Sequence, residues 1–110
     1  MTTTDFNRVI QEQLDYCASL LVTKGNEYSP DNSDRFHNFK VAAVLQGVSS
    51  KEALCGMLAK HVVSVYDMCR GGAYSLERWT EKITDSINYL LLLKALVEEE
   101  HDGQNTSENS

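Results

Sequence analysis

Helix-breaking residues are scarce in this sequence, and patterns typical of β-strands do not occur in it. Proline is present once, as Pro30, and glycine six times in 110 residues. No segment alternates apolar and polar residues over the roughly four to eight positions of a half-buried strand. No internal repeat is present either. These absences argue against sheet-based and repeat architectures and leave a protein built from helices.

Cysteine is also scarce. It occurs as Cys17, Cys55 and Cys69, an odd number without a CxxC pair. Disulfide frameworks of secreted proteins use even numbers of cysteines, and zinc sites use closely spaced pairs. We therefore expect three reduced thiols, buried on the apolar faces of helices in a reducing compartment.

Basic residues are fewer than acidic ones, and long apolar runs are missing. Ten Lys and Arg stand against sixteen Asp and Glu, giving a net charge of −6. A protein that binds nucleic-acid polymers or acidic membranes without specificity needs a basic face. Residues 87–93, the longest uncharged apolar run, are far short of the roughly 20 needed to span a bilayer. The first residues, MTTTDFNRVIQ, lack the basic and apolar regions of a signal peptide. We expect a soluble, cytoplasmic protein that contacts neither a membrane nor a nucleic-acid polymer.

Four segments carry apolar residues at steps of three and four, which predicts four helices. We expect these helices at residues 5–24, 34–46, 50–70 and 76–99. The expected N-caps are Thr4, Ser33, Ser49 and Ser75, with Glu52 completing a capping box at Ser49. Gly25 and Gly47 are expected to end the first and second helices.

Four helices joined by short loops predict an all-α, up-and-down four-helix bundle as a single domain at residues 1–99. Residues 100–110 are polar and lack apolar anchors, so we expect a disordered tail there. The last helix becomes apolar all round at residues 90–93. Such a helix must be buried on several sides. We therefore predict a homodimer interface at residues 90–97, within a dimer or tetramer.

The last helix also carries a stripe of acids. Glu77, Glu81, Asp85 and Asn88 project from one side at 100° per residue. Like charges four residues apart cost a helix a few tenths of a kcal/mol per pair. The stripe is either a solvated acidic face or a site for a cation such as Mg²⁺.

The third helix offers a matching polar stripe, with His61 beside it. Its members are Gly56, Lys60, Ser64 and Asp67. If the two stripes face each other, Lys60, Asp67, Glu81 and Asp85 line a polar pocket that suits a phosphate ligand. His61 is either a packing residue or part of this site.

The segment after the first helix supplies cationic, aromatic and amide groups. Lys24 ends the predicted first helix, Glu27 and Tyr28 lie in the loop that follows, and Arg35 and Asn38 lie in the predicted second helix. Such a mixture suits a nucleobase and its phosphates. Tyr28 either stacks on a base or packs in the fold, whereas Phe36 and Phe39 are more typical of a core.

The order of these motifs resembles small phage-type, all-α proteins related to the MazG-like nucleoside triphosphate pyrophosphohydrolases. The motifs are Glu27-Tyr28, Asn38-Phe39, Lys60 with Asp67, and Asp85 to Tyr89, within residues 24–96. The resemblance implies a four-helix fold that dimerises or tetramerises and Mg²⁺ held by helix carboxylates. It also implies hydrolysis of a nucleotide between its α- and β-phosphates. The chain departs from the pattern: it has no ExxE in the third helix, and Glu81-xxx-Asp85 replaces ExxD.

The sequence thus predicts a nucleotide-binding protein. Three hypotheses remain open: a Mg²⁺-dependent pyrophosphohydrolase, a non-catalytic protein that sequesters a nucleotide, and a helical oligomer without a small-molecule ligand. The candidate catalytic residues are Glu27, Glu81 and Asp85, and the candidate metal ligands are Glu27, Asp67, Glu81 and Asp85. The candidate substrate-binding residues are Lys24, Tyr28, Arg35, Asn38, Lys60, His61, Ser64 and Asn88.

Overall fold

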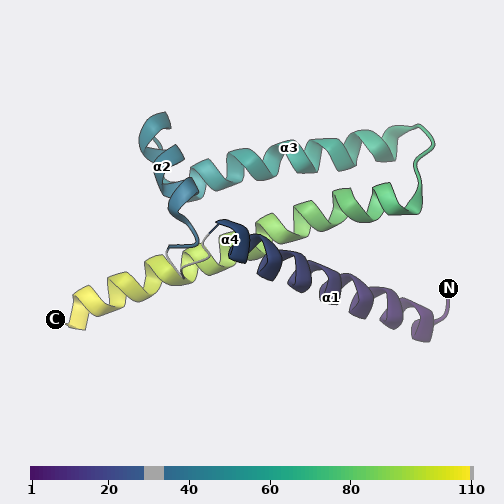
Figure 1. The fold of residues 1–110 in the computed structure, drawn as a ribbon, viewed down its shortest axis with the longest axis horizontal. Coiled ribbons are helices and arrows are strands. Elements are labelled where there is room, and N and C mark those ends of the chain that lie inside the picture. The colour runs from purple at the N-terminus through teal and green to yellow at the C-terminus, as the bar shows by residue number, and fades with distance from the viewer. Residues whose placement is uncertain (29–33, 110) are drawn as a thin grey trace.

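The computed structural model describes residues 1–28 and 34–109, without the side chains of residues 28 and 104–109. Its four helices are α1 (Thr3–Tyr28), α2 (His37–Gln46), α3 (Ser50–Arg70) and α4 (Leu76–Asn109), and these residues contain no strand (Figure 1). The all-α prediction is therefore confirmed. None of the helices in the described ranges is both long and apolar enough to cross a membrane.

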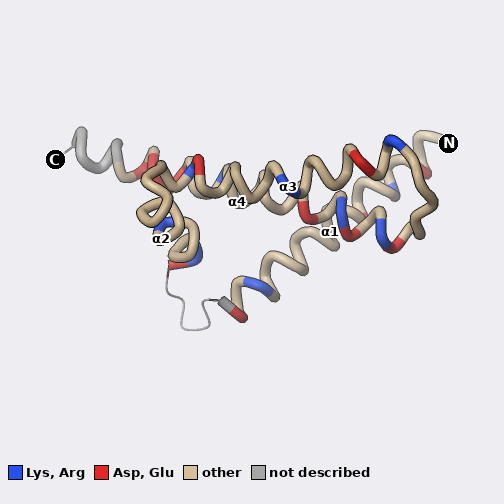
Figure 2. Tube along the Cα trace, turned by 90° about the horizontal axis from the view of Figure 1, so that it is seen from above, with Lys and Arg blue, Asp and Glu red and all other residues tan. Residues whose placement is uncertain are grey.

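The long helices α3 and α4 lie side by side and antiparallel, and they form the central pair of the fold (Figure 1). Helix α2 is short and packs on the start of α3. Helix α1 runs in the same direction as α4 and crosses it obliquely, so their ends diverge (Figures 1 and 2). Among the described helices, the α1 backbone lies close to α4 alone. The contacts are those of a helical bundle, but its α1 side is open.

The bounds of α1 differ from the prediction. The helix is capped by Thr2, whose Oγ1 accepts a hydrogen bond from the Asp5 N–H at 3.1 Å, rather than by Thr4. At the other end α1 continues through Gly25 to Tyr28. A Cβ at position 25 would lie 3.3 Å from Nε of Arg35. Gly25 therefore allows the segment before α2 to approach closely, and it does not end the helix.

The caps of the later helices agree better with the sequence. Ser49 Oγ accepts from the Glu52 N–H, and Ser75 Oγ accepts from the Arg78 N–H, both at 3.1 Å. Gly47 ends α2 in the left-handed conformation, at φ 68°. These three predictions are confirmed.

Two other helix ends were predicted wrongly. Helix α2 begins at His37 rather than Asp34, because the Asp34 carboxylate accepts the Phe36 N–H and forms a turn there. The predicted cap Ser33 lies outside the described residues. Helix α4 continues to Asn109 instead of ending near Glu99.

The apolar core is small. Its buried members are Phe36, Phe39, Leu54 and Leu96, with Tyr89, Leu92 and Leu93 packed against them. Cys17 is buried as predicted, whereas Cys55 and Cys69 are exposed, which corrects the expectation for these two thiols. The core joins α2, α3 and the middle of α4 and leaves most of α1 outside it.

Candidate functional site

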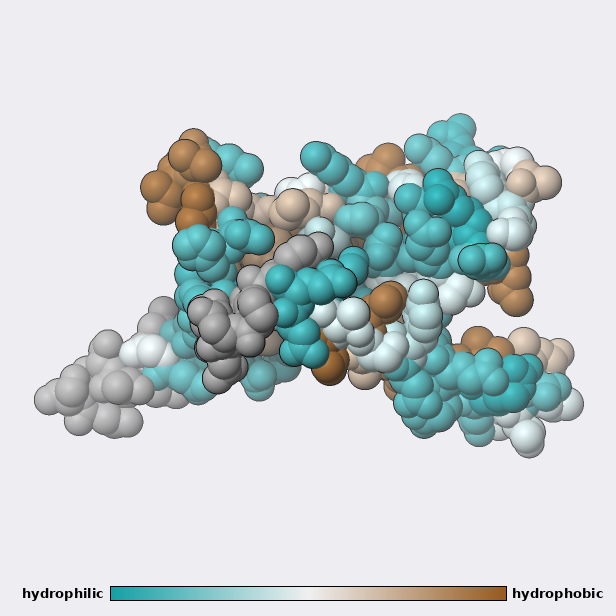
Figure 3. All heavy atoms as spheres, viewed as in Figure 1, coloured by the Kyte–Doolittle hydropathy of each residue, from teal (hydrophilic) through white to brown (hydrophobic). Residues whose placement is uncertain are grey.

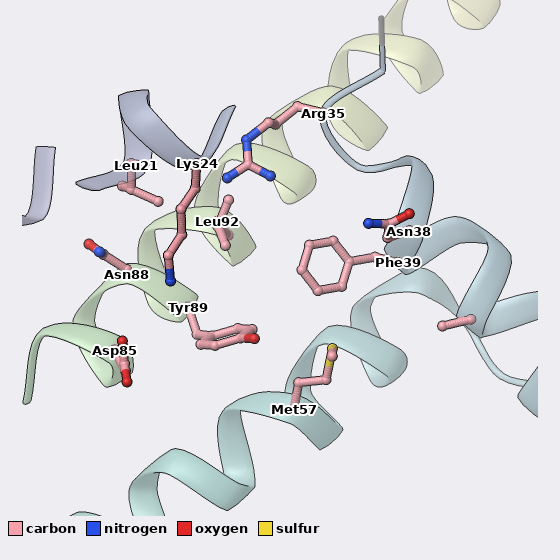
Figure 4. A pocket seen from close by; sticks show the side chains of 11 residues that line it. Leu21, Lys24, Arg35, Asn38, Phe39, Met57, Asp85, Asn88, Tyr89 and Leu92 are labelled. Atoms are coloured by element: carbon pink, nitrogen blue, oxygen red, sulfur yellow. The ribbon is translucent and has the colours of Figure 1, made fainter. Parts of the chain in front are cut away.

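A pocket of about 230 Å³ opens where the end of α1 diverges from the other helices. Helices α1, α2, α3 and α4 and the segment before α2 all contribute to its wall (Figure 4). The lining residues are Leu21, Lys24, Arg35, Asn38, Phe39, Ala42, Met57, Asp85, Asn88, Tyr89 and Leu92. The oblique crossing of α1 over α4 therefore creates a hollow to which polar groups from several helices converge.

The aromatic part of the pocket is built around Tyr89. The Tyr89 ring stacks on His61 of α3, with 4.8 Å between centroids and 27° between planes. The edge of Tyr89 meets Phe39 of α2 at 6.4 Å and 80°. Aromatic pairs favour both geometries, so these neighbours hold Tyr89 in one orientation. A ring held in this way can support a flat ligand without losing further side-chain freedom.

Two cations from different segments point into the same space. Figure 4 shows Lys24 extending from α1 toward Asn88 and Tyr89, and Arg35 extending from the segment before α2 toward α1. Lys24 comes from the last turns of α1, and Arg35 is brought close to α1 by the contact at Gly25. Their positive charge makes this side of the pocket suited to an anionic group.

The α4 side of the pocket presents a carboxylate and an amide. Asp85 Oδ2 lies 3.7 Å from Nδ1 of His61, and both side chains are largely buried. Asn88 is buried, and its Oδ1 has no hydrogen-bond partner among the described residues. Buried polar atoms usually have a partner, so Asn88 is an exception within the pocket wall.

An ion-paired group holds the segment that carries Arg35. The Lys40 ammonium contacts Asp34 Oδ2 at 2.6 Å and Glu99 Oε1 at 2.7 Å. The hydrogen bond from Lys40, followed by that from the Phe36 N–H, lowers the pKa of Asp34. The bonds to Asp34 and then Glu99 raise the pKa of Lys40. These contacts tie the start of α2 to the C-terminal half of α4, next to the pocket.

The structure brings together about half of the predicted site residues. Five of them line the pocket, namely Lys24, Arg35, Asn38, Asp85 and Asn88. His61 lies outside the lining but contacts the lining residues Asp85 and Tyr89. Tyr89 was not predicted from the sequence as a site residue. The available signal was its place four residues after Asp85, which puts it on the same side of the helix.

The other predicted site residues lie elsewhere, so the proposed facing of the two polar stripes is wrong. The residues outside the pocket lining are Glu27, Lys60, Ser64, Asp67 and Glu81. Lys60 and Asp67 are exposed because they precede His61 and Met68, which face inward. Neighbouring helical residues point about 100° apart. The side chain of Tyr28 lies outside the described part of the chain.

The predicted magnesium ligands are not assembled. Within the described residues, no three His, Cys, Asp or Glu side chains lie close enough to hold a metal ion. Glu27 and Asp67 are exposed, and Glu81 contacts Arg78 at 3.6 Å on the surface of α4. Asp85 alone of this predicted set lines the pocket. The residues described here therefore do not fit the multi-carboxylate metal site that the resemblance implies.

The chain matches no family model, no curated protein and no solved structure.

Proposed function

We propose that this protein binds a nucleotide in the pocket between α1, α2 and α4. One observation carries the proposal: two cations, Lys24 and Arg35, share one pocket with a fixed aromatic ring, Tyr89. A nucleotide combines the two complementary features, since its base is flat and its phosphates are anionic. The proposal places the protein in the cytoplasm, where free nucleotides occur.

Each wall of the pocket has a role in this proposal. The base packs against Tyr89, whose other contacts with His61 and Phe39 keep the ring in place. Lys24 and Arg35 bind phosphate oxygens through charge-assisted hydrogen bonds. Asn38 supplies an amide at the α2 side. The volume of about 230 Å³ is below the roughly 300–1,000 Å³ of pockets for larger ligands. The pocket therefore encloses part of the nucleotide and leaves the rest near its mouth.

We favour nucleotide binding without catalysis over nucleotide hydrolysis as the function of this pocket. Two-metal hydrolysis uses several carboxylates to hold the ions and activate water. Asp85 is the carboxylate that this pocket provides among the described residues. The binding experiment below is therefore run with and without Mg²⁺, and it measures product as well as affinity.

A matched pair of lysine variants tests the proposal. Lys24 and Lys60 are both exposed lysines on helices, but Lys24 alone of the two lines the pocket. Calorimetry with a panel of nucleoside mono-, di- and triphosphates measures the Kd of wild type, Lys24→Ala and Lys60→Ala. Losing a charged hydrogen bond costs about 1.5–3 kcal/mol. We therefore expect Lys24→Ala to weaken binding by roughly 10- to 100-fold and Lys60→Ala to leave it unchanged.

Two results would contradict the proposed nucleotide site. Wild type that binds no nucleotide of the panel contradicts the proposed function. Equal losses in both lysine variants show that the ligand lies outside this pocket. Chromatography of the incubated nucleotides detects turnover. Mg²⁺-dependent release of pyrophosphate would show that the protein hydrolyses the nucleotide rather than only binding it.

We also propose that the chain works as a dimer or a larger even-numbered oligomer, whose subunits associate through a surface of α4.

A further inference from the structure

The single chain exposes more surface than a compact protein of its size. Its accessible surface is 7950 Å² at a mass of 12.4 kDa. Folded monomers of this mass expose about 6,100 Å². The radius of gyration is 16.8 Å, whereas a compact domain of this length has about 13 Å. The excess of about 1,800 Å² is comparable with what one subunit buries in an obligate dimer, roughly 1,000–2,500 Å².

Much of the exposed surface is apolar. Figure 3 shows apolar residues on the surface over α2 and along α1. The exposed side chains of α1 include Phe6, Val9, Ile10 and Leu14. Single exposed apolar residues are ordinary, but contiguous apolar surface indicates an interaction site.

The most regular of these surfaces runs along α4. Leu76, Ile83, Leu90 and Val97 are 82%, 38%, 53% and 40% exposed, and we name these four residues the α4 stripe. They follow one another at intervals of seven residues, over a length of about 32 Å. Ile87 and Leu91 lie beside the stripe.

The period of seven indicates what covers the stripe. Apolar residues repeated every seven positions stay in line along a helix that packs against another helix. The described helices of the same chain leave this side of α4 exposed. A surface that two copies share can pair with itself about a two-fold axis. We propose that a second copy of this chain packs its own α4 stripe against this one, in an antiparallel homodimer.

The antiparallel direction follows from residue pairing. With the two-fold axis between Ile83 and Leu90, those two residues meet across the interface, and Leu76 meets Val97. The same register places Lys94 opposite Trp79, where a cation and an aromatic ring attract each other. A parallel pair would instead place the two copies of Lys94 side by side, and like charges repel.

The dimer leaves the pocket accessible. Asp85, Asn88 and Leu92 line the pocket, and at 100° per residue they lie on the side of α4 opposite the α4 stripe. Dimerisation and nucleotide binding therefore use separate surfaces. The dimer can be tested without a ligand, and its failure would not affect the proposed function.

A charge placed in the α4 stripe tests the interface. Light scattering after size-exclusion chromatography gives the mass of wild type, Leu90→Glu and Leu45→Glu over a range of concentrations. Leu45 lies on α2 and is 82% exposed, so it is a matched control outside the stripe. We expect wild type to be a dimer or a larger even-numbered oligomer, Leu90→Glu to have half that mass or less, and Leu45→Glu to match wild type. Because Leu90 is half exposed in the chain, the variant keeps its helical circular dichroism.

Monomeric wild type would overturn the proposal. So would a folded Leu90→Glu that keeps the wild-type mass, since the interface would then lie elsewhere. If Leu90→Glu loses its helical circular dichroism, Leu90→Lys is measured in its place, and a folded Leu90→Lys that keeps the wild-type mass would overturn the proposal.

Cross-linking distinguishes an antiparallel from a parallel arrangement of the two α4 helices. Ile83→Cys and Leu90→Cys are made separately in a Cys55→Ser/Cys69→Ser background, because those two native thiols are exposed. One of the two proteins carries a size tag, and they are mixed before mild oxidation. The antiparallel dimer gives the mixed cross-link between positions 83 and 90, whereas 83–83 and 90–90 cross-links alone would overturn it. Formation of a disulfide requires close and well-directed Cβ atoms, so the readout is specific.

Discussion

Two buried polar residues of α4, one turn apart, should respond to substitution in opposite ways. Asn88 is 8% exposed, and within the described part of the chain its Oδ1 has no hydrogen-bond partner. Thr84 is fully buried, and its Oγ1 accepts a hydrogen bond of 2.7 Å from Nε2 of Gln13 on α1. Leaving a buried polar atom unpaired costs about 1–3 kcal/mol, whereas a made hydrogen bond contributes about 1 kcal/mol.

We therefore expect Asn88→Leu to stabilise the protein and Thr84→Val to destabilise it. Leucine keeps the branched outline of asparagine, and the pocket beside residue 88 has room for its extra volume. Relief of the lower part of the desolvation cost gives a gain of about 1 kcal/mol, or about 4 °C in Tm. Valine at position 84 removes the acceptor for Gln13, with an expected loss of about 1 kcal/mol.

Urea unfolding followed by circular dichroism measures both changes. All samples are compared at one protein concentration, because oligomers gain stability by mass action. The reasoning is refuted if Asn88→Leu loses about as much stability as Thr84→Val. That result would mean that Asn88 Oδ1 makes a stabilising contact in solution, with water or with another subunit.

Two further expectations concern the core and the ion-paired group. Leu54→Ala should cost about 2–5 kcal/mol in urea unfolding because Leu54 is fully buried in the core, and Leu45→Ala on the exposed face of α2 should change stability by less than about 0.5 kcal/mol. Equal losses of stability in the two variants would show that Leu54 does not belong to the core. The hydrogen bond from Lys40 holds the pKa of Asp34 below its ordinary 3.8. The ionised Asp34 carboxylate therefore stabilises the fold at pH values above 3.8, and this contribution is lost as the pH falls through the lowered pKa of the folded state. The stability advantage of wild type over Lys40→Met should therefore shrink between about pH 6 and about pH 2, and a constant difference between the two proteins would contradict this account.

Local chemistry made the helices and several of their ends predictable. Ser49 and Ser75 cap their helices as expected because a serine oxygen needs only the backbone N–H three residues later. Gly47 ends α2 because glycine adopts the left-handed conformation without strain. The role of Gly25 was predicted wrongly, because it depends on Arg35, a residue ten positions away that approaches it in space.

The candidate site was less predictable than the helices. Lys24, Arg35, Asn38, Asp85 and Asn88 were identified by residue type, and the structure places all of them in one pocket. The sequence placed polar residues on faces of helices but gave no means of knowing which faces meet. The facing of Lys60 and Asp67 toward Glu81 was therefore wrong, and Tyr89, with its stacking on His61, was missed.

By itself the sequence determined that this protein is helical, and it located three of the helix caps, at Ser49, Ser75 and Gly47. These properties depend on residues within one or two helical turns of each other. The tertiary structure decided that α1 crosses α4 obliquely, that a pocket forms where the two diverge, and that Tyr89 rather than an acid lies at its centre. Those outcomes depend on how side chains far apart in the chain fit together, and periodicity along one helix does not contain that information.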